Sequence, residues 1–491
     1  MLHDNAAALL DSRPDLTDRI IRAFERLIDC TSTFEDAERA ALRVANELVR
    51  RVLEKQLQQL ADRCGDEFVF QSAVYRPHHA GTVEYHSLCG PLRVTRSSYR
   101  ASGVRNGPTV IPLEIQARLI EDATPALAFS VAQGYAKMPS RHYEEEMRAA
   151  FRIVPSRSTL ERMGKRMGGV AKSLVAQVEP ELRAAESLPS GARSISVGLD
   201  RASVPMIEER PATEKPSTLR KKRTKPYVRT PPHPFDVAYR MAYVGTVSVH
   251  DKDGVALRTW RFAATPEEGA DDLTERVMLE LKHLRSAKSL PLTVVQDGAP
   301  ELWNLLRDGF RRHGIRPTYE VIDRYHFEEH LGRALDILIP DRDERHRVLC
   351  KFREALNRDD DAIDDIATMI EREDYGCTAI SRSWDVPKNV RYARRLSRDD
   401  LRELNSHCTY IVGNRERFRY ATLLKRSLPI GSGVTEGACK SVIGARFKRS
   451  GAHWYQDGLS ACLTLRTLYL SERFESFWPH MQRHYSTTLA A

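Results

Sequence analysis

The sequence predicts a multidomain α + α/β protein, with helical and β-ribbon segments first and a mixed α/β core with an all-helical insertion after them. Three observations predict this fold class. The length of 491 residues suits roughly three domains. Helical periodicity dominates residues 111–190, and an alternating strand pattern begins near Gly191. Hydrophobic residues make up 41% of the chain, which is enough for several packed cores.

Residues 1–110 are predicted to form a helical pair and a small β-ribbon. Apolar residues recur at helical spacing between about residues 14 and 60. From residue 68 to residue 100 the composition becomes β-type, and the turn residues at 89–91 separate two expected strands. The second strand is basic, because it carries Arg93, Arg96 and Arg100.

Residues 111–190 are predicted to form a helical domain that resembles a helix-turn-helix. Two helical segments, 143–151 and 158–170, are separated by a Val-Pro-Ser break at 154–156. The second segment would present Arg162, Lys165 and Arg166 to a DNA groove. Plain packing of two helices in an all-α domain is the alternative.

The first part of the α/β core is predicted at residues 191–325. Strands are expected at 194–200, 237–249, 257–262, 292–295 and 318–322, and helices at 271–284 and 300–313. A proline-containing basic loop at 210–234 interrupts this order. We expect this loop to be mobile and to contact phosphates through Arg220, Lys221, Lys222, Arg223 and Lys225, with plain solvated charge as the alternative.

The composition favours a nucleic-acid partner inside the cell. Lys and Arg number 76 against 67 Asp and Glu, which gives a net charge of +9. No apolar run is long enough to span a membrane, and no signal peptide is evident. We therefore expect a cytoplasmic, nucleoid-associated protein. The eight dispersed cysteines contain no CxxC pair, so we expect reduced thiols and no structural zinc.

Three acids occupy positions suited to binding hard metal ions. Asp200 lies late in the first core strand, on the face opposite its apolar residues. Asp297 follows the 292–295 strand, at the end where α/β sheets place ligands. Glu436 falls in the first turn of a helix, within a closing core segment at 428–491. Carboxylates are natural ligands for the paired Mg²⁺ ions that support phosphodiester cleavage.

Each acid also has an ordinary structural explanation. Asp297 could be a turn residue or a helix N-cap, Asp200 could pair with an arginine, and Glu436 could simply complement the dipole of its helix. A separate pattern, His326 to His330, has the HxxEH spacing of a zinc peptidase. A solvated charged helix is the simpler explanation of that pattern. The basic residues Lys440, Arg446, Lys448 and Arg449 follow Glu436 and are expected to contact DNA.

Three blocks of the sequence resemble Kra-type insertion-sequence transposases, which belong with the Mutator-like group to the DDE transposases. The most specific block is 428–454, which contains Glu436; blocks 197–206 and 294–299 match the two Asp blocks. The similarity covers most of the chain from about Gly81 onward. Many relatives have paired N-terminal cysteines, whereas Cys64 and Cys89 stand alone here.

The resemblance implies an RNase H-like core with Asp200, Asp297 and Glu436 as its metal-binding triad for two Mg²⁺ or Mn²⁺ ions. It implies a helical insertion at 326–427, and it places Asp323 and His326 near the active site. The implied reaction is cleavage at the transposon ends and strand transfer into target DNA. The implied partners are the terminal inverted repeats, target DNA and further copies of this chain. A transposase-derived DNA-binding regulator without catalysis is the rival hypothesis.

Overall fold

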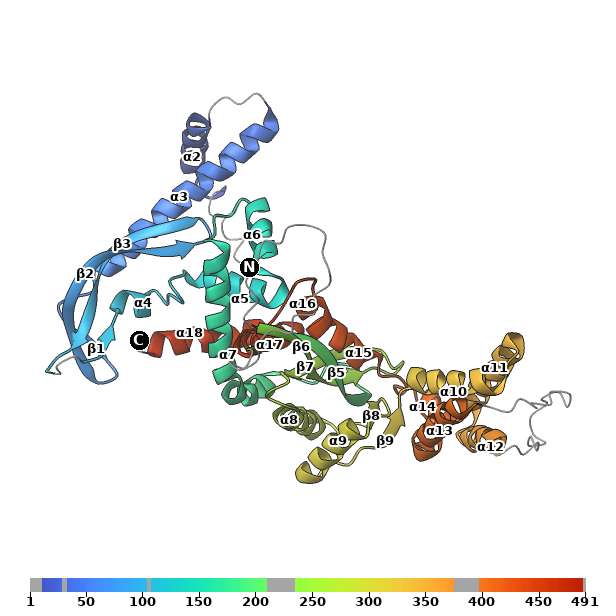
Figure 1. Cartoon of the computed structure of the whole chain (residues 1–491). Coiled ribbons are helices and arrows are strands. Elements are labelled where there is room, and N and C mark those ends of the chain that lie inside the picture. Colours follow the sequence, from blue (N-terminus) through green and yellow to red (C-terminus); the bar gives the residue numbers. More distant parts are fainter. Residues whose placement is uncertain (1–10, 29–32, 104–106, 210–234, 375–396, 489–491) are drawn as a thin grey trace, which may run out of the picture. The chain divides into compact units, whose positions relative to one another are not determined.

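The structure is a computed structural model that describes residues 11–28, 33–103, 107–209, 235–374 and 397–488. The chain is a mixed α/β protein with two sheets (Figure 1). It forms two compact units: residues 1–178 with 474–491, and residues 179–473. The basic loop residues Arg220, Lys221, Lys222, Arg223 and Lys225 lie outside the described ranges. None of the helices within these ranges is long and apolar enough to cross a membrane.

The first unit begins with the predicted helical pair, α2 (Pro14–Leu27) and α3 (Phe34–Asp62). Thr33 caps α3, because its side chain accepts a hydrogen bond from the amide of Asp36. The predicted ribbon is confirmed as an antiparallel sheet of β1 (Phe68–Phe70), β2 (Ala73–Ser87), β3 (Gly90–Ala101) and β4 (Thr109–Val110). Gly90 occupies the turn with a φ of 111°, a conformation that favours glycine.

Five further helices complete the described part of the first unit. They are α4 (Pro112–Gln116), α5 (Pro125–Lys137), α6 (Ser140–Ala149), the start of α7 (Arg157–Ala185) and α18 (Phe474–Thr487). Tyr143 of α6 lies directly over Gly134, and Tyr135 of α5 lies directly over Gly164 of α7. Both α6 and α7 therefore approach α5 closely. The second helix of the predicted pair is much longer than the expected 158–170 segment, since α7 continues to Ala185.

The second unit is built on a five-stranded sheet in the order β7-β6-β5-β8-β9. Its strands are β5 (Ser194–Glu209), β6 (Phe235–His250), β7 (Ala256–Ala264), β8 (Leu292–Gln296) and β9 (Tyr319–Ile322). The pairs β5–β6 and β6–β7 are antiparallel, whereas β5–β8 and β8–β9 are parallel. All five strands were predicted, but β5 continues nine residues beyond Asp200, because β6 pairs with it along its whole length.

Helices cover both faces of this sheet. On one face, α8 (Asp271–Ala287) and α9 (Pro300–His313) bury their apolar sides, and Leu273 and Val277 reach Gly245 of β6. On the other face lie α15 (Gly433–Ala438), a π-helical turn (Cys439–Gly444), α16 (Ala445–Phe447) and α17 (Gln456–Leu470). Gly198 of β5 contacts Thr435 of α15 there. The sheet is thus the middle layer between two helical layers.

The segment between β9 and α15 is helical, as predicted. It contains α10 (Arg324–Leu338), α11 (Arg342–Arg358), α12 (Ala362–Asp374), α13 (Arg398–Gly413), the 3₁₀ turn η1 (Arg415–Arg417) and α14 (Tyr420–Lys425). Phe327, Leu331 and Phe418 of this segment belong to the same buried cluster as Val197 and Val294 of the sheet. The insertion and the sheet therefore share one hydrophobic core.

The buried His250 predicts a loss of stability in acid. Its Nε2 lies 2.7 Å from the Ser196 hydroxyl and its Nδ1 lies 3.1 Å from the carbonyl oxygen of Gly254. Burial lowers the pKa of His250 below its ordinary value of 6.5, so the unfolded state takes up a proton at a higher pH than the folded state. The stability of the folded state is therefore lost progressively as the pH falls below about 6.5.

We expect His250→Gln to show a shallower decrease in the free energy of unfolding between about pH 7.5 and pH 5.5. Urea unfolding at each pH measures this slope. His346→Gln is the control, because His346 is exposed, and it should keep the wild-type slope. Equal slopes for His250→Gln and the wild type would contradict the assignment.

Candidate functional site

Asp200 lies in the central strand β5 and is half-buried. Its Oδ1 accepts a hydrogen bond of 2.6 Å from the amide of Arg201. Burial raises the pKa of the Asp200 carboxyl, and the negative charges of Asp297 and Glu436 raise it further. The three predicted acids therefore interact electrostatically.

Asp297 follows the neighbouring parallel strand. The β5–β8 pairing ends at Val197 and Val294, and Asp200 and Asp297 each follow three residues later in the sequence. A local turn fixes Asp297, because its Oδ1 accepts a hydrogen bond of 2.9 Å from the amide of Ala299. The turn interpretation and the site interpretation of this residue are thus compatible. Between the strands, the buried Gln296 accepts a hydrogen bond from the amide of Leu199 at 3.0 Å.

Glu436 lies in the first turn of α15, as predicted. Its Oε1 accepts a hydrogen bond of 2.8 Å from the hydroxyl of Ser432. The adjacent Thr435 fixes this helix on the sheet, since its hydroxyl lies 2.7 Å from that of Thr246 in β6. Gly198, which contacts Thr435, and Asp200 lie two residues apart in β5, so α15 and its Glu436 lie over the same face of the sheet as Asp200.

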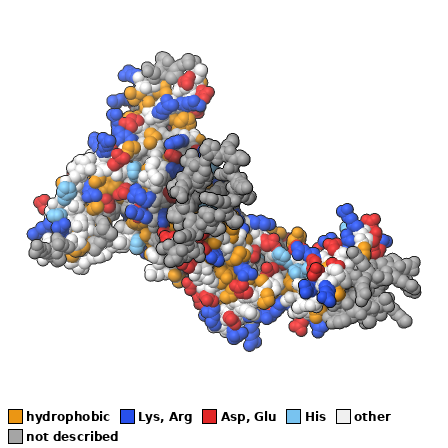
Figure 2. Space-filling view, in the orientation of Figure 1, with side chains coloured by type: hydrophobic (Ala, Val, Ile, Leu, Met, Phe, Trp, Pro, Cys, Tyr) orange, Lys and Arg blue, Asp and Glu red, His pale blue; other side chains and the backbone are white. Residues whose placement is uncertain are grey.

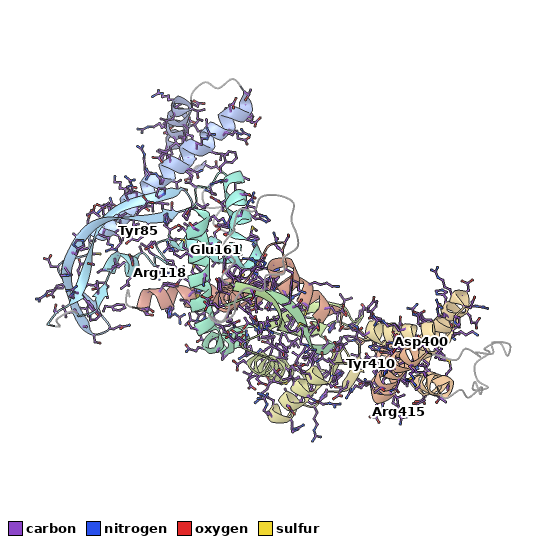
Figure 3. The ribbon with its side chains drawn as sticks, in the orientation of Figure 1. Tyr85, Arg118, Glu161, Asp400, Tyr410 and Arg415 are labelled. Carbon is purple, nitrogen blue, oxygen red and sulfur yellow. The ribbon has the colours of Figure 1, made fainter. Side chains whose placement is uncertain are left out.

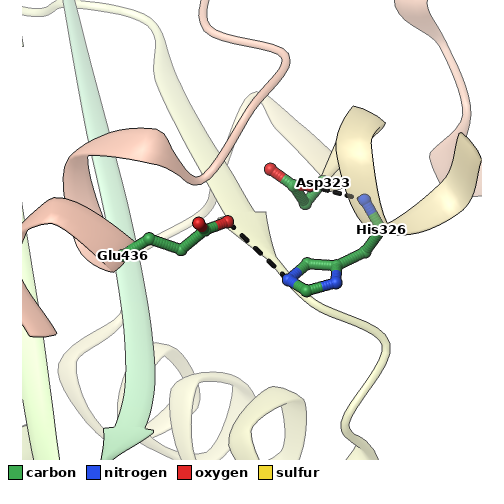
Figure 4. Close-up of side chains that lie close together, drawn as sticks. All are labelled: Asp323, His326 and Glu436. Carbon is green, nitrogen blue, oxygen red and sulfur yellow. Dashed lines mark hydrogen bonds and ion pairs between the residues drawn. The ribbon is translucent and has the colours of Figure 1, made fainter. Parts of the chain in front are cut away.

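Asp323 and His326 form a tight group with Glu436. One potential ligand atom from each of the three residues lies within 4.8 Å of the others. His326 Nε2 is 3.7 Å from Glu436 Oε1, and the two side chains point toward each other (Figure 4). Asp323 is buried and caps α10: Oδ1 accepts from the amide of His326 at 2.8 Å, and Oδ2 accepts from the amide of Ser432.

The tightest cluster within the described ranges therefore differs from the predicted triad. Glu436 belongs to both sets, and the capping residue Asp323 ties α10 to the turn that precedes α15. Asp200 and Asp297 are not part of the 4.8 Å group, and the charges of Asp297 and Glu436 both act on Asp200. The structure thus gathers five side chains from β5, the end of β8, α10 and α15.

Two residues that sequence analysis missed line this region. Tyr410 of α13 lies directly over Gly298, next to Asp297 (Figure 3). Its hydroxyl is buried and has no hydrogen-bond partner within the described ranges, and burial together with the carboxylates of Asp297 and Asp323 raises its pKa. The buried thiol of Cys439 forms a hydrogen bond with Asp200. Only the position of Cys439, three residues after Glu436, offered a signal in the sequence.

The HxxEH pattern does not form one site. His326 faces Glu436, whereas His330 stacks on the ring of Tyr410 with centroids 3.8 Å apart. The Nδ1 atom of His330 also lies 2.9 Å from Nδ1 of His407. The two histidines of the motif therefore have different partners, and the zinc-peptidase alternative loses its structural basis.

The predicted DNA-contact residues fall into two groups. Lys440, Lys448 and Arg449 are exposed near Glu436, and Arg162, Lys165 and Arg166 are exposed on α7, where Arg166 pairs with Glu121 at 3.0 Å. The prediction for Arg446 is wrong. This residue is only 4% exposed, and its guanidinium lies 4.9 Å from the centroid of the Trp454 ring. The downstream tryptophan draws it into the core, so it is unavailable to a phosphate.

Surface charge alone does not single out a DNA-binding face. Figure 2 shows basic and acidic side chains intermixed over the visible surface. Many of these form local ion pairs, for example Arg141 with Glu145. Pairs of this kind leave little net field. The case for a nucleic-acid contact therefore depends on where particular basic residues lie.

The acids and His326 of this site fit a hard divalent cation. Asp200, Asp297, Asp323 and Glu436 supply carboxylate oxygens, which Mg²⁺ and Mn²⁺ prefer, and His326 adds one imidazole nitrogen. Burial, and to a lesser extent the charges of Asp297 and Glu436, raise the pKa of Asp200, and a bound cation would favour its charged form. The unpartnered hydroxyl of Tyr410 adds a polar atom beside them.

Fold and site together define a mixed α/β protein with a group of acids beside strands β5 and β8 of its five-stranded sheet. A scan against models of protein families and a search of curated proteins each give no significant match. The function is therefore inferred from the chemistry of the site.

Proposed function

We propose that the chain is a DDE transposase with an RNase H-like core, of the kind found in Kra-type insertion sequences. One observation carries the proposal: Asp200 in the central strand β5 lies within the electrostatic influence of Asp297, which follows the neighbouring strand β8, and of Glu436 in α15. Clusters of carboxylates at the carboxyl ends of parallel strands are suited to phosphodiester cleavage. The proposed reaction is hydrolysis at the transposon end, followed by attack of the freed 3′-hydroxyl on target DNA.

The architecture supports this assignment. Three antiparallel strands are followed by a helix and by two strands parallel to the first, which is the order expected of the RNase H-like core that the resemblance implies. The helical insertion separates the second acid from the third. The first unit, with its β-ribbon and helices, is then available to recognise the terminal repeats.

The chain's own residues would bind and orient the reacting groups. Asp200, Asp297 and Glu436 would hold two Mg²⁺ or Mn²⁺ ions, which supply charge stabilisation and a water of lowered pKa. Asp323 keeps α10 and the turn at Ser432 together, so it fixes the distance between His326 and Glu436. The Nε2 atom of His326 lies 3.7 Å from Glu436 Oε1. The imidazole can therefore hold a proton beside the cluster.

Gly198 provides a test of how tightly Glu436 must be positioned. A Cβ at this position would lie 2.4 Å from Thr435 Oγ1 and 2.8 Å from the carbonyl oxygen of Val295. Relief of both contacts requires α15 to move and the pairing of β5 with β8 to adjust. We expect Gly198→Ala to reduce DNA cleavage by about tenfold to a hundredfold, since a shift of about 1 Å in a catalytic group has effects of this size.

The matched control is Gly437→Ala, the same substitution one residue from Glu436. A Cβ there would meet nothing within 4 Å, so cleavage and the thermal midpoint should stay near the wild-type values. Cleavage by Gly198→Ala at the wild-type rate would show that the packing of α15 on β5 does not control the site.

The proposed function is tested by incubating the protein with labelled DNA that carries the element's own ends, with Mg²⁺ or Mn²⁺. Strand cleavage that requires the metal and depends on the end sequence is expected. Binding of the same DNA without cleavage would instead support the regulator hypothesis. Proposed partners are the terminal repeats, target DNA and a second copy of the chain, because joining two ends requires both to be held together.

A further inference from the structure

A cavity lined by arginines lies on the second unit, away from the acid cluster. It has a volume of about 500 Å³ and is bounded by α9, the start of β9 and the turn after α13. Four of its lining residues are basic, and two are acidic. The basic residues are Arg307, Arg415, Arg417 and Arg419, and the acidic residues are Glu320 and Glu416. The lining therefore has a surplus of two positive charges.

Arg417 is held rigidly in the wall of this cavity. Its guanidinium lies 4.3 Å from the centroid of the Trp303 ring and donates a 2.6 Å hydrogen bond to Asn414 Oδ1. Arg417 also shares Glu320 Oε2 with Arg307, at 3.3 Å and 2.7 Å respectively. One carboxylate cannot neutralise two guanidinium groups. The wall consequently keeps a positive charge that is fixed in place by packing.

Arg415 and Arg419 add positive charge at the rim of the cavity, and both also border a neighbouring hollow that is lined by Asp359, Asp360, Asp361 and Asp364. Both are exposed, and Arg415 is labelled in Figure 3. Within the described ranges, no acidic side chain lies at ion-pair distance from either residue. Arg419 donates only to the main-chain carbonyl of Glu416, at 3.3 Å. Guanidinium groups without acidic partners are suited to an anion with several oxygens, which they can bind through paired hydrogen bonds.

We propose that this cavity binds phosphate groups of the DNA backbone. The inference rests on the proposed function and names a second DNA contact for it. Tyr319 and Glu320 line the cavity at the start of β9, and Asp323 follows the end of that strand. At about 3.3 Å per residue, the strand spans roughly 10 to 13 Å from Glu320 and Tyr319 to Asp323. Measured along the axis of a DNA duplex, where one strand advances about 3.4 Å per phosphate, this distance corresponds to about three or four phosphates.

The experiment compares two double variants with the same change in charge. Arg415→Gln/Arg419→Gln removes the rim of the cavity without touching its packed wall. Arg342→Gln/Arg402→Gln removes two exposed arginines of the same helical region that do not line the cavity. Fluorescence anisotropy of a labelled end duplex, in EDTA, gives the affinity from about 0.05 to 0.3 M KCl.

We expect the cavity variant to bind DNA about tenfold more weakly and to lose about two units from the slope of log affinity against log salt. The control variant should lose less than about twofold in affinity, since exposed charges far from the DNA are screened. Equal effects of the two variants, or no effect of either, would overturn the inference.

Two further results separate this inference from the proposed function. If the wild type cleaves DNA and the cavity variant binds like the control, only the cavity assignment fails. If the wild type neither binds nor cleaves DNA, the proposed function fails first. Isothermal titration with inorganic pyrophosphate identifies a different ligand source. Binding that is lost in the cavity variant, with DNA affinity unchanged, would assign the cavity to a free phosphate compound and overturn the DNA assignment.

Discussion

Asp297→Asn is expected to reduce DNA cleavage by about three orders of magnitude or more, because removing one metal-binding carboxylate removes several kcal/mol of transition-state stabilisation. Asparagine keeps an oxygen that can accept the hydrogen bond from the Ala299 amide, so the turn after β8 should survive. Binding of end DNA should therefore stay close to the wild-type level. The measurement is single-turnover cleavage of labelled end DNA in Mg²⁺, with anisotropy for binding.

Asp308→Asn is the control for this variant. Asp308 is an exposed residue of α9 that pairs with Arg311 at 3.2 Å, so the charge change is the same and the site is untouched. This control should cleave at the wild-type rate. If Asp297→Asn also retained full cleavage, Asp297 would not belong to the catalytic site, and the group of Asp323, His326 and Glu436 would have to act without it.

Arg473→Met is expected to lower the free energy of unfolding by about 3 to 5 kcal/mol, which is the usual effect of breaking a buried ion pair. Arg473 is 3% exposed and donates to Glu280, which is fully buried, at 2.9 Å. It also contacts Glu186 at 2.6 Å. Without the guanidinium, the Glu280 carboxylate loses its hydrogen-bonded counter-charge and keeps only the weaker influence of Arg183, in a position where burial already raises its pKa. Urea unfolding measures the loss.

Two further variants identify the cause of that loss. Arg402→Met removes an arginine whose pairing with Asp399 is almost fully exposed, so it should change stability by less than about 1 kcal/mol. Glu280→Met combined with Arg473→Met should recover part of the stability, because it removes the buried charge that was left alone. A double variant no more stable than Arg473→Met would show that packing rather than charge dominates at Arg473.

Local signals made most of the second unit predictable. The helix at 300–313 was placed correctly because Pro300 suits its first turn and Gly314 ends it in the left-handed conformation. The full length of β5 was not predictable, since the residues beyond Asp200 carry charges and a proline that weaken the strand pattern. Pairing with β6, which is a distant contact, decides the length of β5.

The site was predictable only where its residues belong to recognisable blocks. Asp200 lies within β5, Asp297 follows β8 and Glu436 lies in the first turn of α15, so each could be placed on or beside an element with a clear sequence pattern. Tyr410 lies in a charged helix more than 100 residues from Asp297 in sequence, and only tertiary packing brings it over Gly298. Arg446 shows the opposite case, because a basic residue in a basic run is drawn into the core by Trp454.

The shared core of the insertion and the sheet limits how the second unit can be rearranged. Phe327 and Phe418 contribute to the same buried cluster as the strands that carry the acids. A deletion that joined β9 directly to α15 would expose that cluster and remove the partner surface of the sheet. The helical segment therefore completes the hydrophobic core of the second unit. Shortened forms of this protein would have to replace its apolar contacts before they could fold.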